Sequence, residues 1–189
     1  MLSNARASLF RLVAAAAFAA IVAPVASAAT IDFSGPRTDP YVQDGFSFTP
    51  IRIVNGNCVS NGCMALNDNE TTTMTSITPP GLFTLTGLSF NLLGQGTDNF
   101  LNLLGSNGTS LTFAVSEFGH NVYNTLTFGN EFANVSSVIF STGDGGNVRV
   151  DDIVASPVPL PAAAWLLLAG IGTLAATRRR RRTGTTAAA

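Results

Sequence analysis

The sequence has no lysine, a single histidine (His120) and none of the motifs that usually identify a catalytic site. It contains no G-x-S-x-G elbow, no H-E-x-x-H helix and no Walker loop. His120 stands in Phe118-Gly119-His120-Asn121, a segment that predicts a loop. A glycosidase needs only two carboxyl groups at a defined separation, but nothing selects a pair among the eleven acidic residues. We therefore predict no catalytic residue, with a small polysaccharide hydrolase as the enzymatic alternative.

Basic residues are scarce in the middle of the chain. Between Ala29 and Pro157 there are three arginines, Arg37, Arg52 and Arg149, and all eleven acidic residues, which gives a net charge of −8. Such a surface repels nucleic acids and anionic polymers unless cations bridge them. Nucleic-acid binding is therefore excluded.

There are only two cysteines, Cys58 and Cys63, too few thiols for a metal site and too widely spaced for a C-x-x-C redox pair. In an exported chain, the expected outcome is a Cys58–Cys63 disulfide. Because the closed loop is short, the chain-entropy model gives a stabilisation of about 2 kcal/mol. No metal or cofactor is predicted from these residues.

One acidic segment leaves calcium binding open. Oxygen ligands among glycines suit Ca²⁺, and Asp144, Asp151 and Asp152 lie in such a stretch. The segment lacks the order of an EF-hand loop, and Asp144-Gly145-Gly146-Asn147 reads equally well as a plain turn. Both interpretations remain open from the sequence alone.

The N-terminus has the pattern of a secretory signal peptide, assigned to residues 1–28. Arg6 and Arg11 precede the apolar stretch Leu12 to Val25, and Ala26-Ser27-Ala28 supplies the small residues that signal peptidase requires. Cleavage is expected after Ala28, with Ala29 as the second choice. The mature chain then begins outside the cytoplasm.

The C-terminus has the pattern of a membrane anchor. Val158 to Thr177 is 20 residues long and has no charge, which is enough for a helix to cross the hydrocarbon core. The predicted transmembrane helix covers residues 160–177. Five consecutive arginines follow and are expected to stay in the cytoplasm with the tail 183–189. These arginines are Arg178, Arg179, Arg180, Arg181 and Arg182.

The order of these parts over residues 158–182 resembles the PEP-CTERM sorting signals of Gram-negative bacteria. The pentapeptide matches the VPLPA variety at every position, namely at Val158, Pro159, Leu160, Pro161 and Ala162. The resemblance implies recognition by exosortase, a membrane-embedded cysteine protease-transpeptidase. It also implies an inner-membrane intermediate with a periplasmic domain, followed by release to the cell surface or extracellular matrix.

Between these ends, residues 29–157 predict a single all-β domain. The segment is rich in Thr, Val, Phe, Asn and Gly and poor in the residues that cover soluble helices. Nine or ten short strands separated by turn residues predict a β-sandwich. The expected strands are 31–33, 45–48, 83–86, 88–92, 100–104, 110–115, 122–128, 135–140 and 148–154.

Two turns are predicted within this domain. Asn107-Gly108 favours a hairpin with a type I′ turn between strands 100–104 and 110–115. Gly87 interrupts two alternating stretches, where a bulge or turn fits.

The opening segments 31–34 and 44–48, together with the closing segments 135–140 and 150–153, resemble the jelly-roll domains found in PEP-CTERM proteins. The leading hypothesis is a non-enzymatic exported surface or matrix protein whose partners are signal peptidase, exosortase and the membrane. The alternative is a carbohydrate-binding module for an exopolysaccharide, with phenylalanines, Tyr41 and Tyr123 stacking on sugars.

Overall fold

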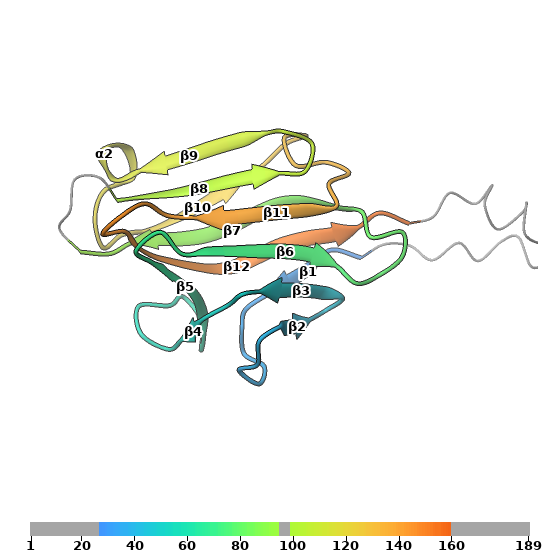
Figure 1. The fold of residues 1–189 in the computed structure, drawn as a ribbon, viewed down its shortest axis with the longest axis horizontal. Coiled ribbons are helices and arrows are strands. Elements are labelled where there is room, and N and C mark those ends of the chain that lie inside the picture. Colours follow the sequence, from blue (N-terminus) through green and yellow to red (C-terminus); the bar gives the residue numbers. More distant parts are fainter. Residues whose placement is uncertain (1–26, 95–98, 160–189) are drawn as a thin grey trace, which may run out of the picture. The chain divides into compact units, whose positions relative to one another are not determined.

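The computed structural model describes residues 27–94 and 99–159 (Figure 1). Residues 26–158 form one compact unit. The expected signal-peptide core, transmembrane helix and arginine run lie outside the described residues, as do the last three residues of the pentapeptide. None of the helices within the described part of the chain has the length and apolarity needed to cross a membrane.

The described unit is an all-β sandwich of two antiparallel sheets, as the composition predicts. The first sheet has the order β10-β7-β12-β5-β4, with β1 also paired to β12. Its strands are β1 (Ala29–Ile31), β4 (Ile53–Val54), β5 (Cys63–Asn67), β7 (Phe83–Leu92), β10 (Tyr123–Thr127) and β12 (Asn147–Pro157).

The second sheet has the order β2-β3-β6-β11-β8-β9. A short helix, α2 (Val115–Phe118), follows β9 directly. The strands are β2 (Tyr41–Gln43), β3 (Phe46–Thr49), β6 (Thr71–Ser76), β8 (Phe100–Gly105), β9 (Ser110–Ala114) and β11 (Ser137–Ser141).

Aromatic and aliphatic side chains from both sheets fill the space between them. In β12, Val148, Val150 and Ile153 are fully buried, whereas Arg149 between them is only half-buried. Such alternation places one side of each strand in the core and the other on the outer face of the sheet. The largest fully buried side chains are Tyr41, Phe33, Phe46, Phe48, Phe83, Phe90, Phe132, Phe140, Ile31, Met64, Leu66 and Met74.

The strand predictions missed four elements, β2, β4, β5 and β6. β2 and β4 contain only three and two residues, too few to show a period. β6 reads Thr-Thr-Thr-Met-Thr-Ser, where the buried Thr72 and the partly exposed Thr73 have the same side chain and so give no hydrophobic contrast. β5 has four buried residues in succession, because its outer face is also covered.

Three predicted strand ends are wrong for local reasons. The strand expected over 31–33 ends at Ile31, and Phe33 has a positive φ of 52° that an extended strand cannot contain. Val115 begins α2 and does not end β9. The strand expected from residue 135 begins at Ser137, and Val135 instead makes an isolated bridge with Phe83.

The irregularity predicted at Gly87 is confirmed, and it lies inside one long strand. In the β7–β12 pairing, Gly87 lies opposite Val154 while Leu85 lies opposite Ala155, so the register shifts there. A Cβ atom on Gly87 would lie 2.7 Å from the Leu126 carbonyl oxygen of β10. Gly87 therefore allows both the bulge and the close approach of β10.

The Asn107-Gly108 hairpin is also confirmed, but its turn type is different from the prediction. Gly108 has a φ of 86°, whereas Asn107 is not among the residues with positive φ, as a type I′ turn would require. Instead the Asn107 side chain accepts a hydrogen bond from the Thr109 N–H. The hairpin turn with positive φ at both positions is Asp44-Gly45, which joins the paired strands β2 and β3 and which is not among the turns predicted from the sequence.

Candidate functional site

The candidate site lies on the outer face of the first sheet, where one row of side chains crosses four strands. Tyr123 of β10 pairs with Asn91 of β7, Asn91 pairs with Arg149 of β12, and Arg149 pairs with Ala65 of β5. We call these four residues the Arg149 row. Residues directly opposite one another in antiparallel strands lie close enough for their side chains to interact.

The Arg149 row contains buried polar atoms without partners. Among the described residues, three buried side-chain polar atoms lack a hydrogen-bond partner, and two of them are Asn91 Oδ1 and Arg149 Nε. Asn91 is only 3% exposed, although it alternates with the core residues Phe90 and Leu92. Because a buried polar group without a partner costs about 1–3 kcal/mol, two such atoms in adjacent cross-strand positions indicate a place where a ligand can supply the missing bonds.

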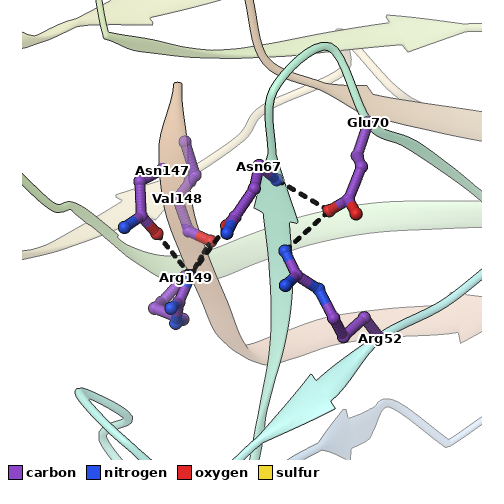
Figure 2. Close-up of polar contacts among 6 residues, drawn as sticks. All are labelled: Arg52, Asn67, Glu70, Asn147, Val148 and Arg149. Atoms are coloured by element: carbon purple, nitrogen blue, oxygen red, sulfur yellow. Dashed lines mark hydrogen bonds and ion pairs between the residues drawn. The ribbon is translucent and has the colours of Figure 1, made fainter. Parts of the chain in front are cut away.

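The guanidinium of Arg149 is held by one of its terminal nitrogens (Figure 2). Nη1 donates to Asn147 Oδ1 at 2.6 Å, to the Val148 carbonyl at 3.0 Å and to Asn67 Oδ1 at 3.4 Å. Asn67 and Asn147 are themselves a cross-strand pair of β5 and β12. The contacts at Nη1 therefore fix the plane of the guanidinium and leave its Nε side without a partner among the described residues.

A second arginine, Arg52, immediately precedes β4. Arg52 Nη2 lies 2.9 Å from Glu70 Oε2, and the same oxygen accepts a hydrogen bond from the Asn67 N–H at 2.7 Å (Figure 2). Both charged side chains are 45% exposed, so this ion pair contributes at most about 1 kcal/mol to stability. It connects Arg52 to Asn67, and through Asn67 to Arg149.

A hollow of about 150 Å³ continues the Arg149 row beyond β5. Ala65, the last residue of the row, lines it together with the Arg52–Glu70 pair. The other lining residues are Pro50, Ile51, Thr71 and Thr72. Tyr123, Asn91 and Arg149 do not line the hollow, so Ala65 is the residue that the row and the hollow share.

Burial changes the acidity of the charged and phenolic groups in the row. Desolvation lowers the pKa of Arg149, and the positive charge of Arg52 lowers it further. Desolvation also raises the pKa of Tyr123, against the opposing effect of a hydrogen bond with Asn91. At neutral pH, Arg149 is therefore a partly desolvated cation, and Tyr123 is a neutral phenol.

One side of the site is bounded by the loop that carries the disulfide. Cys58 and Cys63 are bonded as expected, with their Cα atoms 5.4 Å apart. Asp151, two residues after Arg149 in β12, accepts hydrogen bonds from the N–H groups of Val59 and Ser60, both at 2.9 Å. This contact buries Asp151 completely, so the disulfide loop covers the outer face next to the Arg149 row.

The aromatic residues predicted to stack on sugars differ in their exposure to solvent. Tyr123 is 38% exposed and belongs to the Arg149 row. Tyr41 is fully buried, and its hydroxyl group donates to Gln43 at 2.7 Å, so the prediction that it contacts a sugar is wrong. No described phenylalanine is among the exposed large hydrophobic residues, because the rings pack between the sheets.

The structure does not bring the suggested calcium ligands together. Asp144 is in the exposed turn between β11 and β12, whereas the Asp151 carboxylate is occupied by the disulfide loop. Within residues 27–94 and 99–159, no group of three or more His, Cys, Asp or Glu side chains is arranged to hold a metal ion. The plain turn is the interpretation that the structure supports, with Gly146 N–H donating to the Gly143 carbonyl.

Asp32, Asp151 and Asp152 lie near one another beside the disulfide loop. Asp32 accepts hydrogen bonds from Ser34 and Gln43, and these contacts lower its pKa. Burial raises the pKa of Asp152, and the negative charges of Asp151 and Asp32 add to the shift. The carboxylate oxygens of Asp151 already accept hydrogen bonds from the disulfide loop and from the Asp152 N–H. His120 lies in a loop, as predicted.

Sequence reasoning missed Asn91, Arg149 and Arg52 as site residues. One signal was available: Arg149 stands between two valines in a segment predicted as a strand, in a domain with only three arginines. A charged residue at the outward position of an apolar strand indicates a polar site on that face. Its grouping with Asn91 and Tyr123 depends on strand pairings that the sequence does not reveal.

No family model matches the chain, and no curated protein matches it. Solved structures are similar in fold. They include a family 29 carbohydrate-binding module variant, with 13% identity, a TM-score of 0.43 and coverage of 70% of this chain and 93% of that chain. A xylan-binding domain has 8% identity, a TM-score of 0.38 and coverage of 68% and 93%. A module in complex with β-1,4-galactotriose has 13% identity, a TM-score of 0.35 and coverage of 60% and 87%. Because the similarity is this low, the description of the fold and of the site is based on the residues of this chain alone.

Proposed function

We propose that the chain is an exported, non-catalytic surface or matrix protein whose β-sandwich binds carbohydrate at the Arg149 row. The observation that carries this proposal is the pair of unpartnered buried polar atoms, Asn91 Oδ1 and Arg149 Nε, beside the exposed ring of Tyr123. The disulfide agrees with export, because such bonds persist in oxidising compartments.

The chemistry of the row suits a sugar. A sugar ring has an apolar face of C–H groups that packs on an aromatic ring, and hydroxyl groups that both donate and accept hydrogen bonds. Tyr123 supplies the ring, Asn91 Oδ1 accepts a hydroxyl proton and Arg149 donates to a sugar oxygen. Few polar groups on a rigid sheet are enough to orient a ligand.

A glycan array probed with the purified full-length protein in a neutral detergent tests this proposal. We expect binding to a subset of polysaccharides, lost in Tyr123→Ala and in Asn91→Ala. Val122→Ala is the matched control, because Val122 is 51% exposed and precedes β10 outside the row. Absence of binding to any glycan would leave a purely structural surface protein, and release of reducing sugar would support the hydrolase alternative.

The proposal for sorting rests on the pentapeptide and the residues after it. The sandwich leads directly into this segment: β12 ends at Pro157, and the Val158 N–H donates to the Leu82 carbonyl at 2.8 Å. Two x-Pro steps then favour an extended backbone, the form that a protease groove binds through its main chain. We propose that exosortase recognises this segment and releases the domain from the inner membrane.

A Pro159→Ala and Pro161→Ala double variant separates a sorting signal from a simple anchor. An anchor needs only its apolar span and arginines, so the variant should still insert. We expect it to accumulate at full length in the inner membrane, while the wild type loses its tail in a pulse-chase experiment. Equal release of both proteins, or processing of neither, would show that the tail is only an anchor.

A further inference from the structure

The Nε and Nη2 atoms of Arg149 indicate which kind of ligand group can bind there. Three acceptors occupy Nη1, whereas Nε is buried without a partner and Nη2 makes no hydrogen bond to a described residue. Nε and Nη2 form one edge of the planar guanidinium, with two parallel N–H donors. A carboxylate fits this edge by accepting one hydrogen bond at each oxygen.

Arg149 has no carboxylate partner within the described residues, since the ion pair found there joins Arg52 to Glu70. A partly buried cation without a counter-ion is costly, and burial of Arg149 is reflected in its lowered pKa. The neighbouring acids are committed elsewhere: Glu70 contacts Arg52, and Asp151 holds the disulfide loop. A bound anion would therefore act as the counter-ion that Arg149 lacks among the described residues.

Asn91 and Tyr123 restrict the chemical structure of this anion further. Asn91 Oδ1 has no hydrogen-bond partner among the described residues, and Asn91, which lies opposite Arg149, is only 3% exposed. An acceptor beside the cation requires a ligand with a hydroxyl donor close to its carboxylate. Tyr123, on the other side of Asn91, offers a ring to the apolar face of the same ligand.

We propose that the Arg149 row selects saccharides that contain uronic acid residues, with the sugar carboxylate on the Nε–Nη2 edge of Arg149, a ring hydroxyl donating to Asn91 and the sugar ring against Tyr123. This inference rests on the proposed carbohydrate binding. It deepens that function by naming the acidic sugar as ligand. The net charge of −8 over residues 29–157 opposes long polyanions at a distance, so the selectivity belongs to direct contacts with one or a few sugar residues.

Isothermal titration of the full-length protein in neutral detergent tests the inference with matched oligosaccharides. The probes are short oligogalacturonates and oligomannuronates, the same oligomers after reduction of their carboxyl groups to alcohols, and sulfated oligomers of equal length. We expect the wild type to bind at least one acidic oligomer about tenfold more tightly than its reduced counterpart. The sulfated oligomers should bind less well, because the oxygens of a sulfate ester are weaker hydrogen-bond acceptors than those of a carboxylate.

Arg149→Lys provides the decisive variant, because it keeps the charge and removes the two-donor edge. It should lose about tenfold or more in affinity for the acidic oligomer and little for the reduced one. Arg37→Gln is the control for general charge, since Arg37 contacts Asn55 away from the row. Circular dichroism of each variant establishes that it is folded, and Arg149→Gln serves as a second test of the same position.

The outcomes separate this inference from the function on which it rests. Equal affinity of the wild type for acidic and reduced oligomers would overturn acid selectivity and leave carbohydrate binding intact. A preference for sulfated oligomers, or an equal loss in Arg37→Gln, would show general anion attraction and would also overturn it. Failure to bind any oligomer or arrayed glycan would remove the proposed function and this inference together.

Discussion

The carboxylate of Asp151 accepts hydrogen bonds from the backbone N–H and the hydroxyl group of Ser60, which lies 91 residues earlier in the chain. The contact joins the central strand β12 to the disulfide loop and leaves Asp151 fully buried. A buried carboxylate with several donors is stable because each donor compensates part of its lost hydration. Asp151 therefore fixes the loop that borders the candidate site.

Replacement of Asp151 by asparagine should destabilise the domain by about 2–3 kcal/mol, because one carboxylate oxygen becomes an NH₂ group that faces backbone N–H donors, either those of Val59 and Ser60 or that of Asp152. Chemical denaturation measures this loss. Hydrogen exchange should rise in residues 57–62, next to the disulfide. Asp144→Asn, in an exposed turn, is the matched control and should change stability by less than about 0.5 kcal/mol. An unchanged loop in Asp151→Asn would contradict the anchoring role.

Removal of the disulfide should cost about 2 kcal/mol in a Cys58→Ser and Cys63→Ser variant, since the closed loop is short. Because the bond and Asp151 restrain the same loop, their losses should not add in a double-mutant cycle. Mass spectrometry of the exported wild type should show the crosslink and no free thiol. Free thiols in properly exported protein would disagree with the structure.

Gly87→Ala should destabilise the domain by about 1–3 kcal/mol, because the new methyl group would meet the Leu126 carbonyl at 2.7 Å. The clash lies between β7 and β10, so it should also disturb the pairing of Tyr123 with Asn91 and weaken glycan binding. Gly56→Ala is the control, since no atom lies within 4 Å of a Cβ there. Similar stability of the two variants would argue against the close approach of β10.

Asp152→Asn should stabilise the protein at neutral pH and not at acidic pH. Burial raises the pKa of Asp152 above its ordinary value of 3.8, so the folded state favours the protonated form. The wild type therefore loses stability as pH rises from below 3.8 through the raised pKa, a loss that Asn avoids. Asn also suits the positive φ of 46° at this position.

Asp32→Asn is the matched comparison for this pH dependence, and its sign is opposite. Hydrogen bonds from Gln43 and Ser34 lower the pKa of Asp32, so its stabilising effect is present above 3.8 and is lost as pH falls through the lowered pKa. Denaturation curves from pH 3 to pH 7 compare the two variants with the wild type. Identical pH profiles for both variants would contradict these assignments.

Much of the architecture could be predicted from local sequence. The alternation in Phe83–Leu92 and Val148–Val154 identifies strands, because apolar and polar side chains alternate along the chain with the period of an extended backbone. The irregularity at Gly87 and the hairpin at Asn107-Gly108 follow from the backbone freedom of glycine. The disulfide needs only two cysteines close in sequence and an oxidising compartment.

The candidate site was decided by tertiary structure. Tyr123, Asn91, Arg149 and Ala65 come from four strands, and their row exists only in one combination of registers. Those registers are selected by the packing of two sheets over a shared core, since a shift of one residue would turn each inward side chain outward. Tyr41 also depends on tertiary structure. The sequence is compatible with a sugar contact at this residue, but Tyr41 is buried between the sheets. Composition and periodicity therefore determine that strands form, whereas the polar atoms left unpaired on the outer face depend on long-range pairing.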